Sequence, residues 1–135
     1  MHSPTKRIRG FADACSALFA IERRFEQAHA VASLDDDGRV IDLTVFTRDS
    51  HTIDDALNWA SCLTFNEPDV TRMVLMSLRP EGVTNIRESD MELYRKARDV
   101  FGRKEVDVVD WLLYDGELVR SVAITCGLKT WEPGM

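Results

Sequence analysis

The chain has 135 residues, of which 44% are hydrophobic and 30% are charged, and its formal net charge is −6. This length fits one domain with a single core, since about 100–200 residues per domain is usual, and the composition is that of a globular protein. The acidic balance makes nucleic acid a poor candidate partner, because proteins that grip a phosphate backbone usually present a basic face. A helix that spans a bilayer needs about 20 apolar residues, and no apolar run in this sequence approaches that length. A membrane protein is therefore not expected.

The three cysteines, Cys15, Cys62 and Cys126, are widely spaced, and each lies in apolar sequence. An odd number at such spacings is typical of reduced thiols rather than of a disulfide framework. We therefore expect all three side chains to face the core of a cytoplasmic protein. A cysteine nucleophile is not favoured, because buried thiols are usually inert. The N-terminal segment does not resemble a signal peptide, so secretion is not expected.

Residues 11–28 predict the first element, an amphipathic helix whose apolar residues recur at spacings near three and four. The apolar positions of its inner face are Phe11, Cys15, Leu18, Phe19 and Phe25. Residues 29–46 then form two short apolar stretches around Asp37-Gly38, a dipeptide that favours tight turns. This pattern predicts a β-hairpin, and its acidic turn, residues 35–37, is expected to be solvated rather than to bind calcium.

A second helix is predicted from Thr52 to about Asn66, with two aspartates in its first turn, where the helix dipole favours negative charge. Its inner face holds Ile53, Ala56, Leu57, Ala60 and Leu63. Residues 71–77 are a short apolar run that predicts a buried strand. The run from Ser89 to Glu92 is typical of a capping box and predicts a third helix, which Gly102 ends. The inner face of that helix holds Leu93, Tyr94, Ala97, Val100 and Phe101.

Residues 105–124 predict a strand, a turn at Asp115-Gly116 and a second strand. The expected order is therefore α-β-β-α-β-α-β-β, which favours a three-layer α/β domain with a mixed sheet and flanking helices. We expect a single domain over residues 10–128, preceded by an N-terminal tail of residues 1–9. The C-terminal tail, residues 129–135, is expected to lie as a strap over the edge of the core.

Residues that could carry chemistry are few. His2, His29 and His51 are the only histidines, and none has a second ligand at a spacing typical of zinc sites. Polar or helix-capping roles are favoured for them. No nucleophile elbow, P-loop or dinucleotide-binding glycine motif is present. Trp59 and Trp111 stand in amphipathic or apolar segments and are expected in the core.

The loop after the predicted central strand carries the most specific pattern. Residues 73–76, MVLM, run into residues 77–82, SLRPEG, and Arg87-Glu88-Ser89-Asp90 leads into the next helix. In this loop and in its order of elements the chain resembles the RadC-like branch of the JAB (JAMM, MPN) metalloprotease domains, over about residues 28–127. The resemblance implies a JAB/cytidine-deaminase-like fold. In that family the strand leads into His-x-His-Pro-Ser-Gly and then Ser-x-x-Asp; the histidines and the aspartate bind zinc, and an upstream glutamate is the acid/base.

The same comparison shows where this chain departs from the family. The positions of the vestigial site are Ser77, Arg79, Pro80, Gly82, Asp90, Asp110 and Trp111. Ser77 and Arg79 replace the two zinc-binding histidines, and Trp111 replaces a further family histidine. Near Asp42 to Thr44, where the glutamate would fall, no glutamate stands. Because catalytic zinc needs about three protein ligands, the resemblance implies a degenerate domain without zinc or another cofactor.

Two classes of function stay open. The first is a catalytically inactive JAB-like domain that binds a partner protein or scaffolds a complex, with a homodimer as one form. The second is a metal-free enzyme or small-anion-binding domain that uses Arg79 and Asp90. The first is favoured, because no activated nucleophile or base is visible. Arg79 is expected either to pair with Asp90 in the vacated site or to point into solvent, and the sequence leaves both open.

Overall fold

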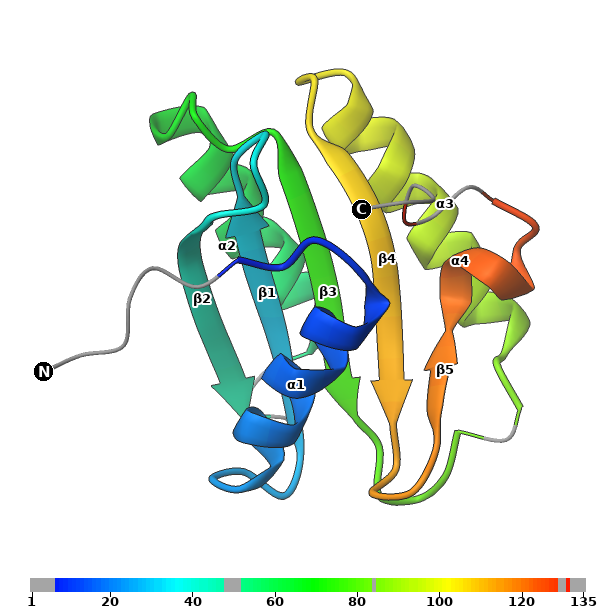
Figure 1. The fold of residues 1–135 in the computed structure, drawn as a ribbon. Helices are drawn as coiled ribbons and strands as arrows, with labels where there is room; N and C mark the ends of the chain where they lie inside the picture. The colour runs from blue at the N-terminus through cyan, green and yellow to red at the C-terminus, as the bar shows by residue number, and fades with distance from the viewer. Residues whose placement is uncertain (1–6, 48–51, 84, 129–130, 132–135) are drawn as a thin grey trace, which may run out of the picture.

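The computed structural model describes residues 7–47, 52–83, 85–128 and 131. These residues form a mixed α/β fold with a five-stranded sheet and four helices (Figure 1). The elements in chain order are α1 (Phe11–Glu22), β1 (Ala28–Leu34), β2 (Val40–Thr47), α2 (Ile53–Asn66), β3 (Arg72–Leu78), α3 (Glu88–Gly102), β4 (Asp107–Tyr114), β5 (Val119–Ser121) and α4 (Val122–Thr125). The expected α/β class is confirmed. The first eight elements occur in the expected order, and the short helix α4 follows them.

The sheet has the strand order β2-β1-β3-β4-β5. Strand β1 is antiparallel to both of its neighbours, β3 is parallel to β4, and β5 is antiparallel to β4. Strands β2 and β3 therefore point the same way. Helices α2 and α3 each return the chain from the end of one strand to the start of the next, so they run parallel to each other and opposite to these strands. The loop of residues 79–87 joins the carboxyl end of β3 to the amino end of α3.

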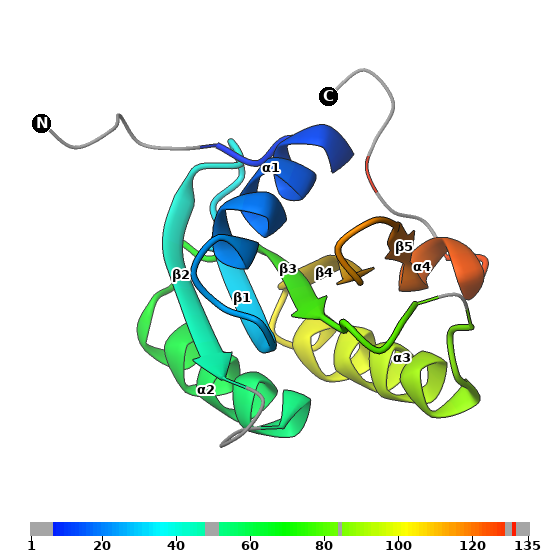
Figure 2. The same ribbon diagram turned by 90° about the horizontal axis from the view of Figure 1, so that it is seen from below.

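The helices cover the two faces of the sheet unequally. Helix α1 lies on one face, and α2 and α3 lie on the other (Figure 2). Along β3, Met73 and Leu75 pack into the core under α2 and α3, whereas Val74 and Met76 pack into the core under α1. This is the two-residue alternation of a strand. By the same alternation, Ser77 belongs to the face that α2 and α3 cover.

The first helix is shorter than expected, since it ends at Glu22 rather than at residue 28. Ala28 already starts β1, a strand whose seven residues are all buried. Two aromatic residues assigned to the inner face, Phe11 and Phe19, are 39% and 41% exposed. The buried residues of the helix, Ala14, Leu18 and Ile21, are spaced three and four apart, and Ala17 and the Phe19 ring add contacts beside them. The remaining apolar positions therefore lie on its flanks.

The start of α3 also differs from the prediction. The helix begins at Glu88, and its N-cap residue is Arg87 rather than Ser89. The carboxylate of Asp90 accepts a hydrogen bond from the backbone N–H of Arg87 at 3.1 Å. Asp90 thus holds the first turn from the third helical position, and the capping box expected over Ser89 to Glu92 is wrong. Val100, which was assigned to the inner face, is 36% exposed.

The last predicted strand is cut short. After Ser121 the chain turns into α4, where residues up to 124 were expected to continue the strand. The Ser121 hydroxyl accepts a hydrogen bond from the backbone N–H of Ile124 at 3.1 Å, which is the bonding of a helix N-cap. A local side-chain bond therefore competes successfully with strand formation.

Two residues expected in the core lie on the outer side of α2. Trp59 is 41% exposed, and Cys62, three residues later on the same side, is exposed as well. Cys15 and Cys126 are half-buried, and all three thiols are free. The core of α2 comes instead from the small residues Ala56 and Ala60. The prediction of three core-facing cysteines is therefore wrong for Cys62.

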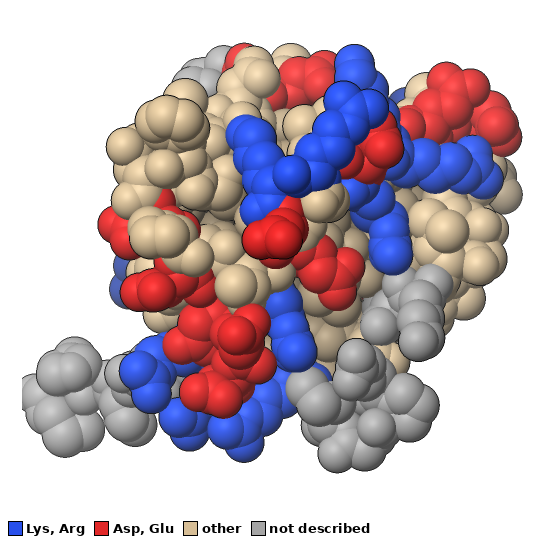
Figure 3. Space-filling view, turned by 90° about the horizontal axis from the view of Figure 1, so that it is seen from above, with Lys and Arg blue, Asp and Glu red and all other residues tan. Residues whose placement is uncertain are grey.

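The ends of the described chain pack against the domain. The backbone N–H of Ile8 donates to the carbonyl of Gly38 at 2.7 Å, and the Ile8 side chain is buried. Trp131 packs against the core under α1, as expected of a strap, and its neighbours 129–130 and 132–135 lie outside the described residues. On the face seen from above, acidic and basic side chains are interspersed (Figure 3). Among the described residues, no helix is long and apolar enough to span a membrane.

Candidate functional site

The end of β3 and the loop after it bring most of the predicted site residues together. Ser77 is fully buried, and the side chain of Arg79, two residues further, is 12% exposed. The Arg79 backbone N–H donates to the carbonyl of Tyr114 at 2.7 Å, which extends the pairing of β3 with β4 by one bond. This bond fixes the place from which the Arg79 side chain starts. Pro80 is exposed, and Gly82 has φ +120°, a conformation that side chains disfavour.

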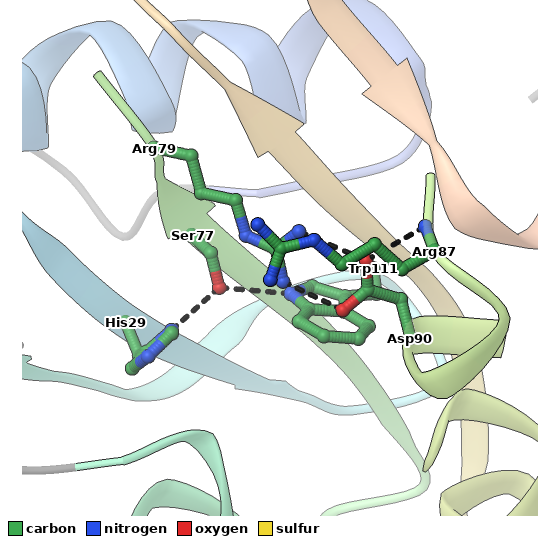
Figure 4. A network of polar contacts seen from close by, with 6 residues as sticks. All are labelled: His29, Ser77, Arg79, Arg87, Asp90 and Trp111. Carbon is green, nitrogen blue, oxygen red and sulfur yellow. Dashed lines mark hydrogen bonds and ion pairs between the residues drawn. The ribbon is translucent and has the colours of Figure 1, made fainter. Parts of the chain in front are cut away.

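Arg79 and Asp90 form a two-pronged ion pair across the loop (Figure 4). One terminal nitrogen of the guanidinium lies 2.8 Å from Oδ1 of Asp90, and the other lies 2.9 Å from Oδ2. Only 12% and 9% of the two side chains are exposed. Of the two orientations that the sequence left open for Arg79, the structure therefore has the paired one. Two such parallel bonds fix the orientation of the two side chains and also strengthen the attraction between their charges.

The charge state of Asp90 follows from two opposing influences. Burial raises the pKa of its carboxyl group, and the hydrogen bonds from Arg79 and from the backbone of Arg87 lower it. The net result is a pKa below the usual 3.8. Asp90 is therefore a carboxylate near neutral pH, and it cannot act as a proton donor there.

A second set of buried bonds is centred on Ser77. The indole Nε1–H of Trp111 donates to the Ser77 hydroxyl oxygen at 2.8 Å, and Nδ1 of His29 lies 2.6 Å from the same oxygen. Indole nitrogen is only a donor, so the hydroxyl oxygen accepts from Trp111. In the bond with His29, the tautomer of the imidazole decides which of the two groups donates. The three side chains come from β3, β4 and β1, and each is more than nine-tenths buried.

Trp111 joins the two sets of bonds. The central carbon of the Arg79 guanidinium lies 5.4 Å from the centre of the Trp111 ring, within the range of a cation–π contact. Arg79 therefore lies above an aromatic ring whose nitrogen bonds Ser77, and at the same time it pairs with Asp90. Figure 4 shows these side chains in one continuous group.

Asp110, another position of the vestigial site, makes a separate set of buried bonds. Its carboxylate accepts hydrogen bonds from the Ser121 hydroxyl at 2.6 Å and from the backbone N–H groups of Trp111 and Ala123, at 2.7 and 3.1 Å. These bonds hold the corner between β5 and α4. Asp110 is fully buried and makes structural contacts, whereas Ser77, Arg79, Asp90 and Trp111 make up the candidate site.

His29 is the residue of this group that the sequence did not indicate. It was assigned a polar role at the start of a strand, and nothing in its neighbourhood along the chain connects it with Ser77. The connection arises from the antiparallel pairing of β1 with β3, in which His29 stands directly opposite Ser77. Only the register of two strands separated by 48 positions could have shown it. His2 and His51 lie outside the described residues.

The chemistry open to this group is limited, because its polar atoms bond one another. Within the described ranges, no group of three or more His, Cys, Asp or Glu side chains is arranged to hold a metal ion. At the position expected for an acid/base glutamate, the Thr44 hydroxyl donates to Asp42 at 2.6 Å. The Arg79 guanidinium places a positive charge beside Asp90, where a bound cation would otherwise be needed to balance that carboxylate.

No model of a known protein family matches the sequence, and no curated protein matches it either.

Proposed function

We propose that this protein is a catalytically inactive, RadC-like JAB domain that serves as a protein-binding or scaffolding module. The resemblance of residues 77–82 and of Asp90 to the zinc-binding loop of that family supports the proposal, together with a mixed sheet that lies between helices. A cytoplasmic location is part of the proposal, and the three free thiols are consistent with it.

The observation that carries the proposal is the ion pair of Arg79 and Asp90. In an active relative an aspartate at this position is a zinc ligand, and zinc supplies the charge that makes the carboxylate stable in a partly buried place. Here the guanidinium supplies that charge and directs both terminal nitrogens to the two carboxylate oxygens. Arg79 therefore takes over the electrostatic role of the metal, but it cannot activate water as the metal does.

The alternative function, binding or conversion of a small anion by Arg79, has less support. A guanidinium that binds a substrate carboxylate or phosphate offers its paired N–H groups to that ligand. In this structure the two terminal nitrogens already donate to Asp90, and the Arg79 side chain is only 12% exposed. An anion would have to displace a partly buried carboxylate that both terminal nitrogens of Arg79 already bind.

The experiment that tests the proposal has two arms. In the first, the tagged chain is recovered from its native host after mild cross-linking, and the accompanying proteins are quantified by mass spectrometry. In the second, heats of binding are measured for phosphate and acetate with the wild type and with Arg79→Ala. One partner in near-stoichiometric amount, with no Arg79-dependent heat, supports the proposal. Anion binding that Arg79→Ala abolishes, without a stoichiometric partner, would overturn it in favour of the alternative.

A further inference from the structure

A groove runs between α2 and α3 on the side of the molecule opposite α1. It forms an open hollow of about 420 Å³, lined by buried or half-buried apolar residues such as Leu57, Ala97 and Phe101 and by exposed polar residues such as Asp54 and Glu92. Leu57 and Ser61 of α2 face Leu93, Val100 and Phe101 of α3 across it. Since the two helices run in the same direction, the groove has one end at their amino ends and the other at their carboxyl ends.

An unusually exposed aromatic residue continues the wall of this groove. Asp54, Asn58 and Ser61 line it from one stripe of α2, and the next position of that stripe, four residues after Ser61, is Phe65. Phe65 is 84% exposed, more than any other large hydrophobic residue among those described. Neither a helix cap nor the core of this domain accounts for it, so a partner that covers it would bury apolar surface.

The charged residues of the groove are separated by sign along its length. Asp54 and Glu92 line the part nearer the amino ends of the helices. Lys96 lies one turn beyond Glu92, and at the far end the Lys104 ammonium donates to the Ser61 hydroxyl at 2.6 Å. Among the charged residues that line the groove or bond its lining, the carboxylates thus lie toward the amino ends of the helices and the ammonium groups toward the carboxyl ends.

A two-fold axis across the middle of such a groove makes it complementary to itself. The second copy then runs in the opposite direction, so that its basic end meets the acidic end of the first. Glu92 and Lys96, one helical turn apart near the centre of α3, would each face the other residue of the second copy. The same rotation places each Phe65, which lies beyond Ser61 toward the carboxyl ends, against the amino ends of α2 and α3 of the other copy.

We propose that the protein forms a homodimer through the groove between α2 and α3, with Glu92 of each copy against Lys96 of the other and with Phe65 buried in the interface. The inference rests on the proposed role as a binding module and names one partner for it. Its test measures association of the chain with itself, so its failure is distinguishable from that of the proposed function, which the experiment above tests separately.

The test measures the oligomeric state of the full chain by sedimentation, for the wild type and for variants at exposed positions. Circular dichroism checks that each variant is folded. The wild type is expected to sediment as a dimer at micromolar concentration. Glu92→Lys and Lys96→Glu should each weaken the dimer by at least about ten-fold, because every single reversal places two like-charged pairs in the interface. An equimolar mixture of the two variants should dimerise again, since each lysine of one then faces a glutamate of the other.

The matched control is Arg95→Glu, a charge reversal on the same helix at an exposed position that does not line the groove. It should leave dimerisation unchanged, whereas Phe65→Ala should weaken it without lowering the thermal stability of the monomer. A monomeric wild type at about 100 µM, or a mixture of Glu92→Lys and Lys96→Glu that stays monomeric, would overturn the proposal. Equal effects of Arg95→Glu and Glu92→Lys would also overturn it.

Discussion

Arg79 and Asp90 form the contact on which the account of this site depends at the scale of single residues. A buried carboxylate costs several kcal/mol unless a charge or hydrogen bonds compensate it, and here both come largely from one guanidinium. The Trp111 ring beneath Arg79 restricts its orientation further. Removing Arg79 therefore removes more than the energy of a surface ion pair.

We predict that Arg79→Ala lowers the free energy of unfolding by several times the about 0.2–1 kcal/mol typical of exposed pairs, because it leaves the Asp90 carboxylate without its cation. Arg103→Ala is the matched control, since Arg103 pairs with Asp99 at 2.7 Å but both side chains are mostly exposed, at 74% and 63%. Urea denaturation of both variants measures the difference. A loss for Arg79→Ala no larger than that for Arg103→Ala would show that the pair is energetically a surface pair.

The titration of Asp90 provides an independent measurement. Its pKa in the folded protein lies below 3.8, so its contribution to stability is fully present above about pH 4 and is lost as the pH falls through the folded pKa. In Arg79→Ala the burial remains and the main compensating bonds are gone, so the pKa of Asp90 should rise. Carboxyl ¹³C NMR titration of both proteins checks this. An unchanged Asp90 pKa in the variant would mean that Arg79 does not set its charge state.

At the scale of elements, Ser77 joins three neighbouring strands through side-chain bonds. Its hydroxyl lies between Trp111 of β4 and His29 of β1, all out of contact with bulk water. We predict that Ser77→Ala costs about 1–3 kcal/mol, because it leaves a buried indole N–H without an acceptor. Thr71→Ala is the control, since the Thr71 hydroxyl makes an exposed bond to Asp36. Equal stabilities of the two variants would contradict a structural role for the Ser77 bonds.

The loop between β3 and α3 depends on the backbone of Gly82. Its φ of +120° is one that other residues rarely adopt, and an added methyl group would meet no atom within 4 Å. Gly82→Ala should therefore destabilise the protein by about 1–3 kcal/mol through backbone strain alone. Gly102, at the end of α3, also has open space around it but no such φ, and Gly102→Ala should be neutral or slightly stabilising. Thermal unfolding of both variants measures the difference, and equal stabilities would contradict the role of backbone strain at Gly82.

The elements that the sequence predicted well are those with a strong local signal. The apolar run 71–77 and the turns at Asp37-Gly38 and Asp115-Gly116 carry their own periodicity or turn chemistry, so strands and hairpins follow from them. The helix α4 was missed because the Ser121 cap and the Asp110 carboxylate, eleven residues away along the chain, act together only in the folded protein.

The candidate site was predicted only in part, because only some of its contacts join residues that are close along the chain. Arg79 and Asp90 are joined by one loop, so their meeting could be expected from chain order. His29 enters through strand register, and the exposure of Trp59 follows from its place on the outer side of α2. Helical periodicity indicates that a residue is apolar and where it points on its own helix, but not whether another element covers that direction.

At the scale of the whole molecule, we propose that a JAB-like framework has kept its shape while its metal-binding residues were replaced. Ser77 lies near the end of β3 and Arg79 directly follows it, and both precede the amino end of α3, where Asp90 stands. If these positions correspond to those of a zinc-binding loop, restoring two histidines should restore binding of the metal. The wild type, by contrast, is expected to hold no stoichiometric zinc.

The most direct measurement is therefore a zinc titration of the double variant Ser77→His, Arg79→His beside the same variant carrying Asp90→Ala, with circular dichroism to select folded protein. We predict zinc binding no tighter than about micromolar for the double variant, because side chains that orient ligating histidines were not kept for that task. Binding should be lost with Asp90→Ala, and peptidase activity should stay absent without a glutamate acid/base. A folded double variant that binds no more zinc than the wild type, or whose binding is unaffected by removing Asp90, would contradict the JAB-like assignment of this loop.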